Sequence, residues 1–455
     1  MACLASGLFL ISCSPRQPAT REDVLQWNLK TLQAGYASSG HRNPKWDKDS
    51  EAALTGFART RTASEDESVV LFDLVSEAAE SATAAGCDDP MIQYLHVHYA
   101  PENKTRKFKQ RQEQYLSAAH NLESSAYPPI RKFYANVEAS EVLYPQRYTN
   151  FWPEVHDLRA KAVANLNQAL QDKSLPEAEA YPAAEALFQM LERNPYELTN
   201  AYNALAATLS RNNSKPAVAQ LIKAQFYLTF AWRARGNGNA DQVTEEGWRL
   251  FRERLAEAEK ALNKAWAADP FDGQIPTLMI AIAVGQQKPR PEMEIWFQRA
   301  LKQDPDNYRA CRSKLHYLLP QWYGSRADML DFGRECVAST NWGGQVPLAL
   351  VDAHSEFSRT LDAEDRKTYW LAPDVWPDIK AAYEKFAQLN PDATRFRYPY
   401  AAYAFRCGQA QAFNEQVQLI RRNDASPDYA YFGGKEAFDK MVEQANPPES
   451  AGAAH

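Results

Sequence analysis

The sequence is poor in glycine and contains no long uninterrupted run of apolar residues. Only 18 of its 455 residues are glycine, whereas 27 are proline. Beyond the first 13 residues, no stretch approaches the roughly 18 uncharged apolar residues that a membrane-spanning helix requires. No segment of alternating apolar and polar residues is long enough to predict a sheet. These absences favour a chain of many helices that are joined by short turns, with prolines placed at the turns.

An excess of positive charge is also lacking. Lys and Arg number 51 against 57 Asp and Glu, which gives a net charge of −6 and a sequence pI of about 5.9. Because a phosphate backbone is bound by a basic face, we expect no nucleic acid partner.

Motifs of catalysis and phosphate binding are missing. Neither G-x-S-x-G nor H-E-x-x-H occurs, and no glycine-rich loop ends in G-K-[ST]. The carboxylates of Asp352, Glu356, Asp374 and Asp378 are scattered, with no spacing that pairs one as acid with another as base. We therefore expect a protein that is not an enzyme and holds no cofactor.

The cysteine pattern argues against a metal cluster. Two cysteines, Cys3 and Cys13, fall in the N-terminal segment. The other four are widely spaced with no C-x-x-C pair, and we expect them to be buried free thiols: Cys87, Cys311, Cys336 and Cys407. His96 and His98 lie two residues apart, a spacing that does not share a helix face. No nearby Cys or third His completes a site, so no metal is expected.

The N-terminus resembles an export signal. Residues 4–11 are mostly apolar, and Leu10-Ile11-Ser12-Cys13 resembles the lipobox of bacterial lipoproteins. No Lys or Arg precedes the apolar run, although a secretory signal usually has one. The resemblance implies that Cys13 carries a lipid, that the preceding peptide is removed, and that the protein is anchored in the bacterial cell envelope, on the periplasmic or outer-membrane side.

A dipeptide of Asn or Asp followed by proline recurs four times along the chain. Asn194-Pro195, Asp269-Pro270, Asp304-Pro305 and Asn390-Pro391 each follow an amphipathic helical pattern. Small or apolar residues precede the first three prolines by 12, 8 and 5 positions. They are Ala183, Leu187 and Met190; Ala258, Leu262 and Ala265; and Met293, Phe297 and Ala300. This spacing predicts helices that pack through one face and stop near a proline.

The spacing resembles the second helix of a tetratricopeptide repeat. Pro270 and Pro305 lie 35 positions apart, against a family period of 34. The clearest unit places Trp296 and Phe297 on the apolar stripe of its helix, so both should be buried. The resemblance implies an all-α superhelix of tetratricopeptide-like helix pairs, with less regular helices before it. Such superhelices commonly bind peptides or proteins on their concave face.

A narrower resemblance rests on four segments: GCDDPMIQYL (86–95), ARGNGNADQVTEEGW (234–248), AWAADP (265–270) and PQWYGSRADMLDFGREC (320–336). They resemble an uncharacterised bacterial family with tetratricopeptide-like helices. The resemblance adds to the fold and implies no catalytic residue.

The chain divides into five expected regions. Residues 1–13 form the lipoprotein-type signal, 14–63 a tether and irregular segment, and 64–172 an N-terminal helical region. Residues 173–445 carry the tetratricopeptide-like helical repeats, and 446–455 form a disordered tail.

We expect a non-enzymatic scaffold that is tethered to a membrane and binds a protein or peptide partner. Two other classes remain open because the chain is rich in Trp and Tyr. One is a glycan-binding surface lipoprotein, in which exposed rings stack on sugars. The other is an α/α-toroid glycoside hydrolase or lyase, in which two carboxylates face a central cleft.

Replacement of Cys13 by Ala tests the lipid anchor. We expect wild-type cells to incorporate an alkyne fatty acid into the protein and Cys13→Ala cells to incorporate none, because the lipid has lost its attachment site. In-gel fluorescence after click labelling measures this. Cys3→Ala is the control and should label normally; equal labelling of Cys13→Ala and wild type contradicts the prediction.

Overall fold

The computed structural model is built from α-helices. It describes residues 20–39, 41–63, 65–100, 108–144, 152–212, 216–236, 238, 240–391, 393–423 and 429–446, and these contain no strand. The N-terminal helices are α1 (Arg21–Ser39), α2 (Asp47–Thr60), α3 (Glu65–Ala84), α4 (Pro90–His98), α5 (Phe108–Glu123), α6 (Pro129–Leu143) and α7 (Trp152–Gln171).

The remaining helices follow one another with short connections. They are α8 (Glu177–Leu191), α9 (Pro195–Arg211), α10 (Pro216–Arg235), α11 (Glu245–Ala268), α12 (Gln274–Gly285), α13 (Arg290–Gln303), α14 (Tyr308–Tyr317), α15 (Arg326–Ala338), α16 (Ala349–Arg359), α17 (Ala363–Trp370), α18 (Val375–Leu389), α19 (Arg397–Arg406), α20 (Ala410–Asn423) and α21 (Lys435–Ala445). Most helices pack against their sequence neighbours, so the expected all-α superhelix is confirmed.

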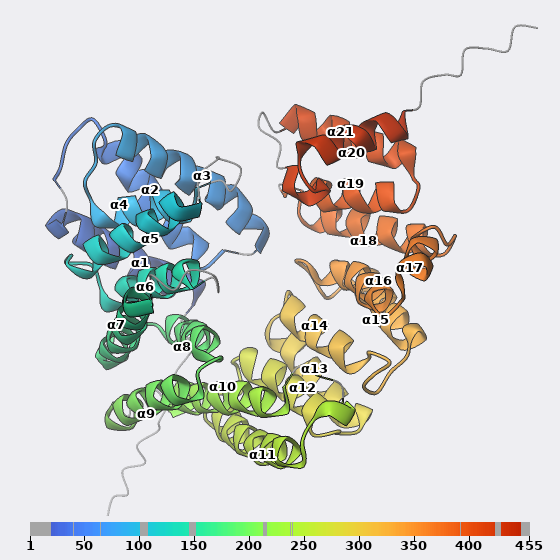
Figure 1. Cartoon of the computed structure of the whole chain (residues 1–455), viewed down its shortest axis with the longest axis horizontal. Helices are drawn as coiled ribbons and strands as arrows, with labels where there is room; N and C mark the ends of the chain where they lie inside the picture. Colours follow the sequence, from blue (N-terminus) through green and yellow to red (C-terminus); the bar gives the residue numbers. More distant parts are fainter. Residues whose placement is uncertain are drawn as a thin grey trace, which may run out of the picture.

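The helices curve into an incomplete ring (Figure 1). The chain runs down one arm from α3 to α8, crosses the base through α9 to α11, and rises through α12 to α21 along the other arm. An exposed ion pair joins the two arms, with Arg395 Nη1 3.6 Å from Asp73 Oδ1. No helix in the described ranges is both long and apolar enough to span a bilayer.

The N-terminal segment is more regular than its sequence predicts. Residues 14–63 were expected to be irregular, but α1 and α2 occupy most of the part that is described, from residue 20 onward. The buried face of α1 includes Val24 and Leu32, but also Asn28 and Gly35. A polar residue and a glycine at core positions weaken the apolar periodicity, which explains why the helix escapes sequence analysis.

The proline-anchored spacing corresponds to buried positions. All nine residues that precede the first three prolines are at most 6% exposed. Trp296 and Phe297 are also buried, at 9% and 2%. At the first proline, Asn194 also caps the next helix, because its side chain accepts from the backbone N–H of Glu197 at 3.2 Å. The Asn194-Pro195 dipeptide therefore lies where α8 ends and α9 begins, within four residues.

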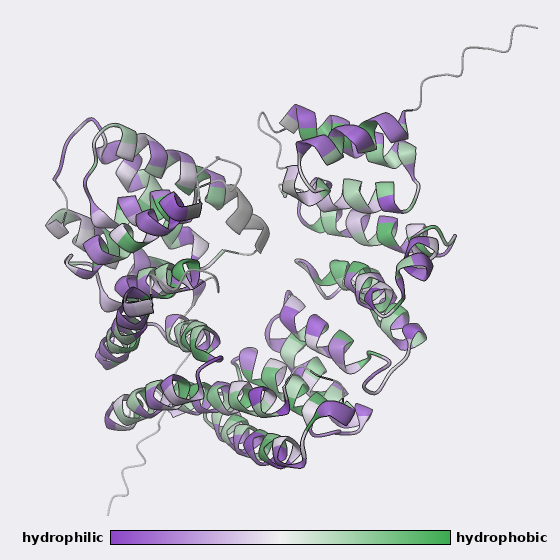
Figure 2. Cartoon of the chain, in the orientation of Figure 1, coloured by the Kyte–Doolittle hydropathy of each residue, from purple (hydrophilic) through white to green (hydrophobic). Residues whose placement is uncertain are grey.

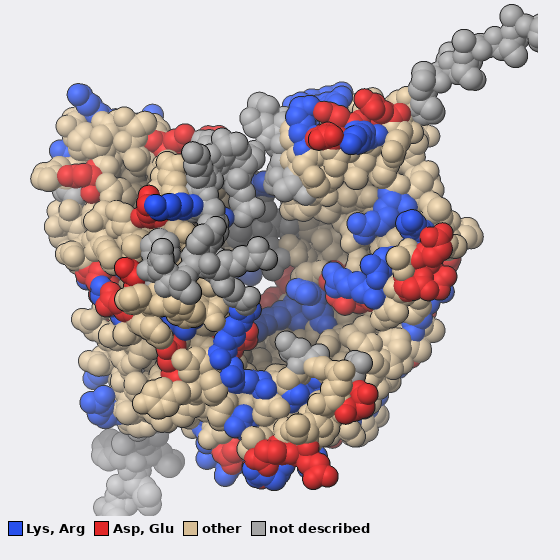
Figure 3. Space-filling model, in the orientation of Figure 1, with Lys and Arg blue, Asp and Glu red and all other residues tan. Residues whose placement is uncertain are grey.

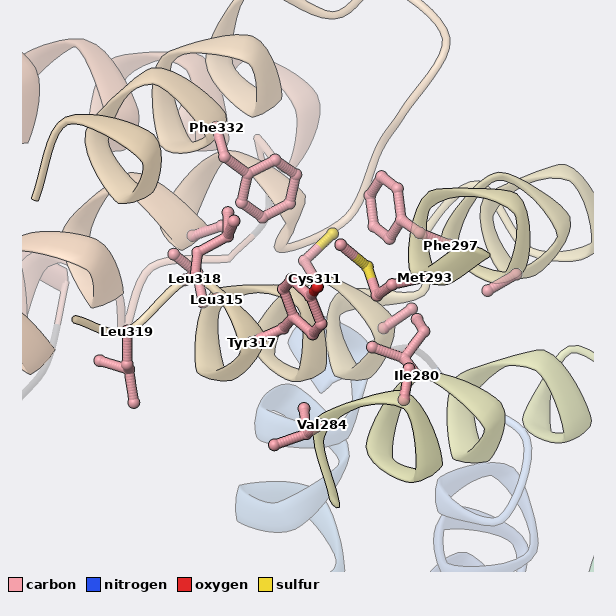
Figure 4. Packing of buried hydrophobic residues seen from close by; sticks show 14 of the residues in the cluster. Ile280, Val284, Met293, Phe297, Cys311, Leu315, Tyr317, Leu318, Leu319 and Phe332 are labelled. Atoms are coloured by element: carbon pink, nitrogen blue, oxygen red, sulfur yellow. The ribbon is translucent and has the colours of Figure 1, made fainter. Parts of the chain in front are cut away.

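The hydrophobic core is continuous from the middle of the chain to its C-terminal helices, and a separate cluster fills the N-terminal helices. Figure 2 shows apolar residues gathered where helices meet, and Figure 4 shows one such layer, where Phe297, Phe332 and Cys311 converge between α13, α14 and α15. Tyr227 and Trp376 each pack against two neighbouring clusters, so successive layers are continuous. The four cysteines of the described ranges, Cys87, Cys311, Cys336 and Cys407, are buried free thiols as expected.

A buried ion cluster joins the N-terminal helices to α8. Glu179 of α8 is 1% exposed and pairs with Arg61, the residue that follows α2, at 2.8 Å between Nη2 and Oε2. Asn28 of α1 donates to the same carboxylate at 3.0 Å, and Arg131 of α6 donates to Asn28. Burial alone would raise the pKa of Glu179, but Arg61 and Arg131 outweigh it and hold this pKa below its ordinary range.

Overpacking at Ala300 tests the helix register. Ala300 is fully buried, so Ala300→Trp should destabilise the protein by about 1–3 kcal/mol or more. Thermal and urea denaturation measure the change. The matched control is Ala256→Trp on α11, where the alanine is exposed and little loss is expected. Equal denaturation midpoints for the two variants would show that the assigned register is wrong.

Removal of the Glu179 charge tests the ion cluster. Glu179→Gln leaves the buried Arg131 and the partly exposed Arg61 without their carboxylate and should cost about 3–5 kcal/mol near neutral pH. Because folding lowers the pKa of Glu179, its stabilisation is present above the ordinary glutamate pKa and is lost as pH falls through the lowered value. The difference from wild type should therefore shrink in acid. Urea denaturation across pH measures it, with exposed Glu192→Gln as control; a pH-independent difference contradicts this account.

Candidate functional site

A groove of about 600 Å³ lies on the inner face of the ring. Helices α10, α12, α14 and α16 form its walls, and Figure 3 shows Lys and Arg side chains gathered around the hollow between the arms. The lining residues are Trp232, Ala281, Val284, Tyr308, Arg309, Arg312, Ser313, Leu315, His316, Leu319, Asp352 and Glu356. Its volume is in the range of ligand sites in proteins.

Helix α14 presents most of the polar groups. Asn307 caps the helix by accepting from the backbone N–H of Ala310 at 2.9 Å, which fixes where the first turn begins. Arg309, Arg312 and His316 then recur at intervals of three and four residues, so they share one face. The opposite face buries residues such as Cys311, and this packing holds the polar face toward the groove.

Arg309 links the groove to the opposite arm. Its Nη1 donates to Glu185 Oε2 of α8 at 3.0 Å, and Nη2 donates to the other carboxylate oxygen. Burial lowers the pKa of Arg309, but the hydrogen bonds to Glu185 outweigh this and raise it overall. The guanidinium is therefore a fixed cation that is already paired, and this pair connects α14 to α8 across the ring.

Asp352 lies between a phenol and a second arginine. Tyr308 donates its hydroxyl proton to Asp352 Oδ2, while Arg312 Nε stays 3.8 Å from the same oxygen. Burial raises the pKa of Asp352, and the nearby Glu356 adds to the rise, against the lowering effects of Tyr308 and Arg312. Arg312 keeps 65% of its side chain exposed and forms no hydrogen bond with the other described residues.

The second groove carboxylate, Glu356, already has a partner on its own helix. Arg359 Nη1 donates to Glu356 Oε1. His316 faces the same region with its side chain open to the groove. Burial lowers the pKa of His316, and the charge of Arg235 adds to this effect. The neutral form of the imidazole is thereby favoured, and Arg312 is the groove cation left with unused donors.

The floor of the groove is apolar. Val284, Leu315 and Leu319 lie there with Trp232, whose ring meets Trp322 edge to face at 6.0 Å between centroids. A mixed surface of this kind can hold an extended chain that alternates apolar and polar groups. Bound acids would be attracted to Arg312, since the neighbouring charges are neutralised within the protein.

Sequence analysis had found only part of this site. It named Asp352 and Glu356 as scattered carboxylates, but the structure brings them to one groove. Their companions Asp374 and Asp378 lie elsewhere, where Arg326 and Arg334 pair with them. Arg309, Arg312 and His316 were missed, although their period of three to four residues on α14 could have revealed a shared polar face.

The structure says little of Cys13 and gives His98 a structural role. Cys13 falls outside the described residues. His98 ends α4, and its Nδ1 lies 2.7 Å from Glu138 Oε2, a structural contact between α4 and α6. Within the described ranges, no three His, Cys, Asp or Glu side chains converge as a metal site.

Comparison with models of protein families and with curated proteins finds no match to this chain.

Proposed function

We propose that this chain is a non-enzymatic interaction scaffold whose inner groove binds an extended segment of a protein or peptide partner. The supporting observation is the charge pairing around the groove. Glu185, Asp352 and Glu356 each accept from a donor of the chain itself, whereas the exposed guanidinium of Arg312 makes only a 3.8 Å ion pair with Asp352 and no hydrogen bond with the other described residues. A partner segment that brings an acidic group to Arg312 and apolar side chains to the floor would fit this pattern.

The repeat resemblance supports the same proposal. The nine positions of the tetratricopeptide-like spacing are buried, as packing residues of such repeats would be. The clearest repeat unit consists of α12 and α13. The groove lies on the side of α12, its first helix. This is the concave side, on which helical superhelices commonly bind partners.

The scaffold would be held close to a membrane. If Cys13 carries a lipid, only residues 14–20 separate it from α1, which begins at Arg21. Seven extended residues reach about 25 Å at most. The ring would then lie near the envelope membrane surface, and its partner would be a membrane protein or a protein that passes close to the membrane.

One observation favours an enzymatic alternative. Asp352 and Glu356 lie one helical turn apart in the groove, and the pKa of Asp352 is raised, as in a general acid of a glycoside hydrolase. Against this, Tyr308 and Arg359 already occupy the two carboxylates. Glycan binding without turnover is the other alternative, and it would rely on exposed rings.

Charge reversal at Arg312 tests the scaffold. Cross-linking and pull-down from native membranes should recover a partner with wild type, and Arg312→Glu should reduce recovery about tenfold or more, because an acidic partner group would face a like charge. The fold should be unaffected because Arg312 is exposed. Arg252→Glu makes the same charge change at an exposed site on α11 outside the groove and should recover the partner normally.

The same preparation distinguishes the alternatives. Equal recovery by both charge-reversal variants contradicts groove binding. Turnover of chromogenic glycosides that Asp352→Asn abolishes would replace the scaffold with the hydrolase. Binding on a glycan array without turnover would favour the glycan-binding lipoprotein.

A further inference from the structure

A second pocket, remote from the groove, lies between α18, α19 and α20. Its volume is about 380 Å³. Trp376, Phe396 and Tyr400 supply aromatic rings to its wall, and Arg397 and Gln416 supply polar groups. The rings of Trp376 and Tyr400 are nearly parallel, with 19° between their planes and 5.9 Å between centroids. The pocket thus combines an ordered aromatic wall with a single guanidinium.

Arg397 is partly buried and lies over the ring of Phe396, 4.9 Å from its centroid, but it has no acidic partner among the described residues. Its Nη1 donates to the neutral amide oxygen of Gln416 at 3.1 Å, and its Nε is enclosed without any hydrogen-bond acceptor. It forms no ion pair with the other described residues, and burial lowers the pKa of this arginine with no carboxylate opposing the effect. A desolvated charge without a counter-ion is costly, so such groups are usually paired.

The carboxylates of the pocket do not serve Arg397. Glu384 pairs with Lys380 at 3.7 Å, and Glu415 accepts from Gln411 Nε2 at 3.0 Å. Both act instead on Tyr400, whose pKa rises to about 12, mainly through burial. Because these two acids would repel a doubly charged phosphate, the pocket suits a ligand with a single negative charge.

We propose that this pocket binds a small organic carboxylate. The carboxylate would pair with Arg397, whose Nη1 alone is engaged by Gln416, and guanidinium groups match the two oxygens of a carboxylate. The apolar body of the ligand would lie against Trp376 and Phe396, since aromatic walls favour flat apolar groups. This site is separate from the groove and does not depend on the proposed scaffold function.

Benzoate and its neutral analogue benzamide are suitable probes. Both present a flat ring, but only benzoate carries the charge. Saturation-transfer NMR with the full chain in detergent should show benzoate binding at least about tenfold more tightly than benzamide, because only benzoate forms charge-assisted hydrogen bonds. Arg397→Met should lose this preference. Arg252→Met, at an exposed site on α11 outside both the pocket and the groove, is the matched control and should bind benzoate like wild type.

A second variant covers the case in which Arg397→Met does not fold, as judged by circular dichroism. Trp376→Ala keeps the guanidinium and removes a ring, so it should weaken benzoate binding about tenfold. The proposal is overturned if wild type binds neither probe or binds both equally. It is also overturned if a folded Arg397→Met, or Trp376→Ala in its place, binds benzoate like wild type.

Discussion

The carboxylate of Glu179, buried between Arg61 and the Asn28–Arg131 pair, is the interaction on which the attachment of the N-terminal helices to the rest of the stack depends. It joins α1, α2 and α6 to α8, the helix that begins the regular stack. Burying these charges is costly, and the cost is offset only when every member is present in the right geometry. The N-terminal helices are therefore fixed to α8, the helix from which the rest of the superhelix continues.

The fixed junction has a direct effect on the groove. Glu185 lies on α8, less than two turns after Glu179, so the cluster that anchors α8 also sets where Glu185 meets Arg309. Arg309 in turn stands one turn before Arg312 on α14. The charge left open in the groove is thus positioned by residues more than a hundred positions away in sequence, through a chain of ion pairs and rigid helices.

Sequence alone predicts the part of this structure that local periodicity controls. Ala258, Met293 and Ala300 follow a spacing that marks packing positions, and burial confirms them. The same reasoning fails at α1, because Asn28 is a core residue only in the presence of Glu179 and Arg131. It also fails for the groove, since Tyr308 and Asp352 are 44 positions apart and nothing in either local pattern indicates that they meet. Polar contacts between residues far apart in the chain produce no periodic pattern in the sequence.

The ring closure has a consequence for the order of folding. Most contacts in a stack of helices join neighbours in sequence, and such local contacts form quickly. The Asp73–Arg395 pair spans 322 positions, and the Glu185–Arg309 pair spans 124. Closing such long loops costs entropy that one exposed ion pair does not recover. The arms must therefore contact each other only after both have folded. During synthesis, the arm that leaves the ribosome first folds before the other arm is made.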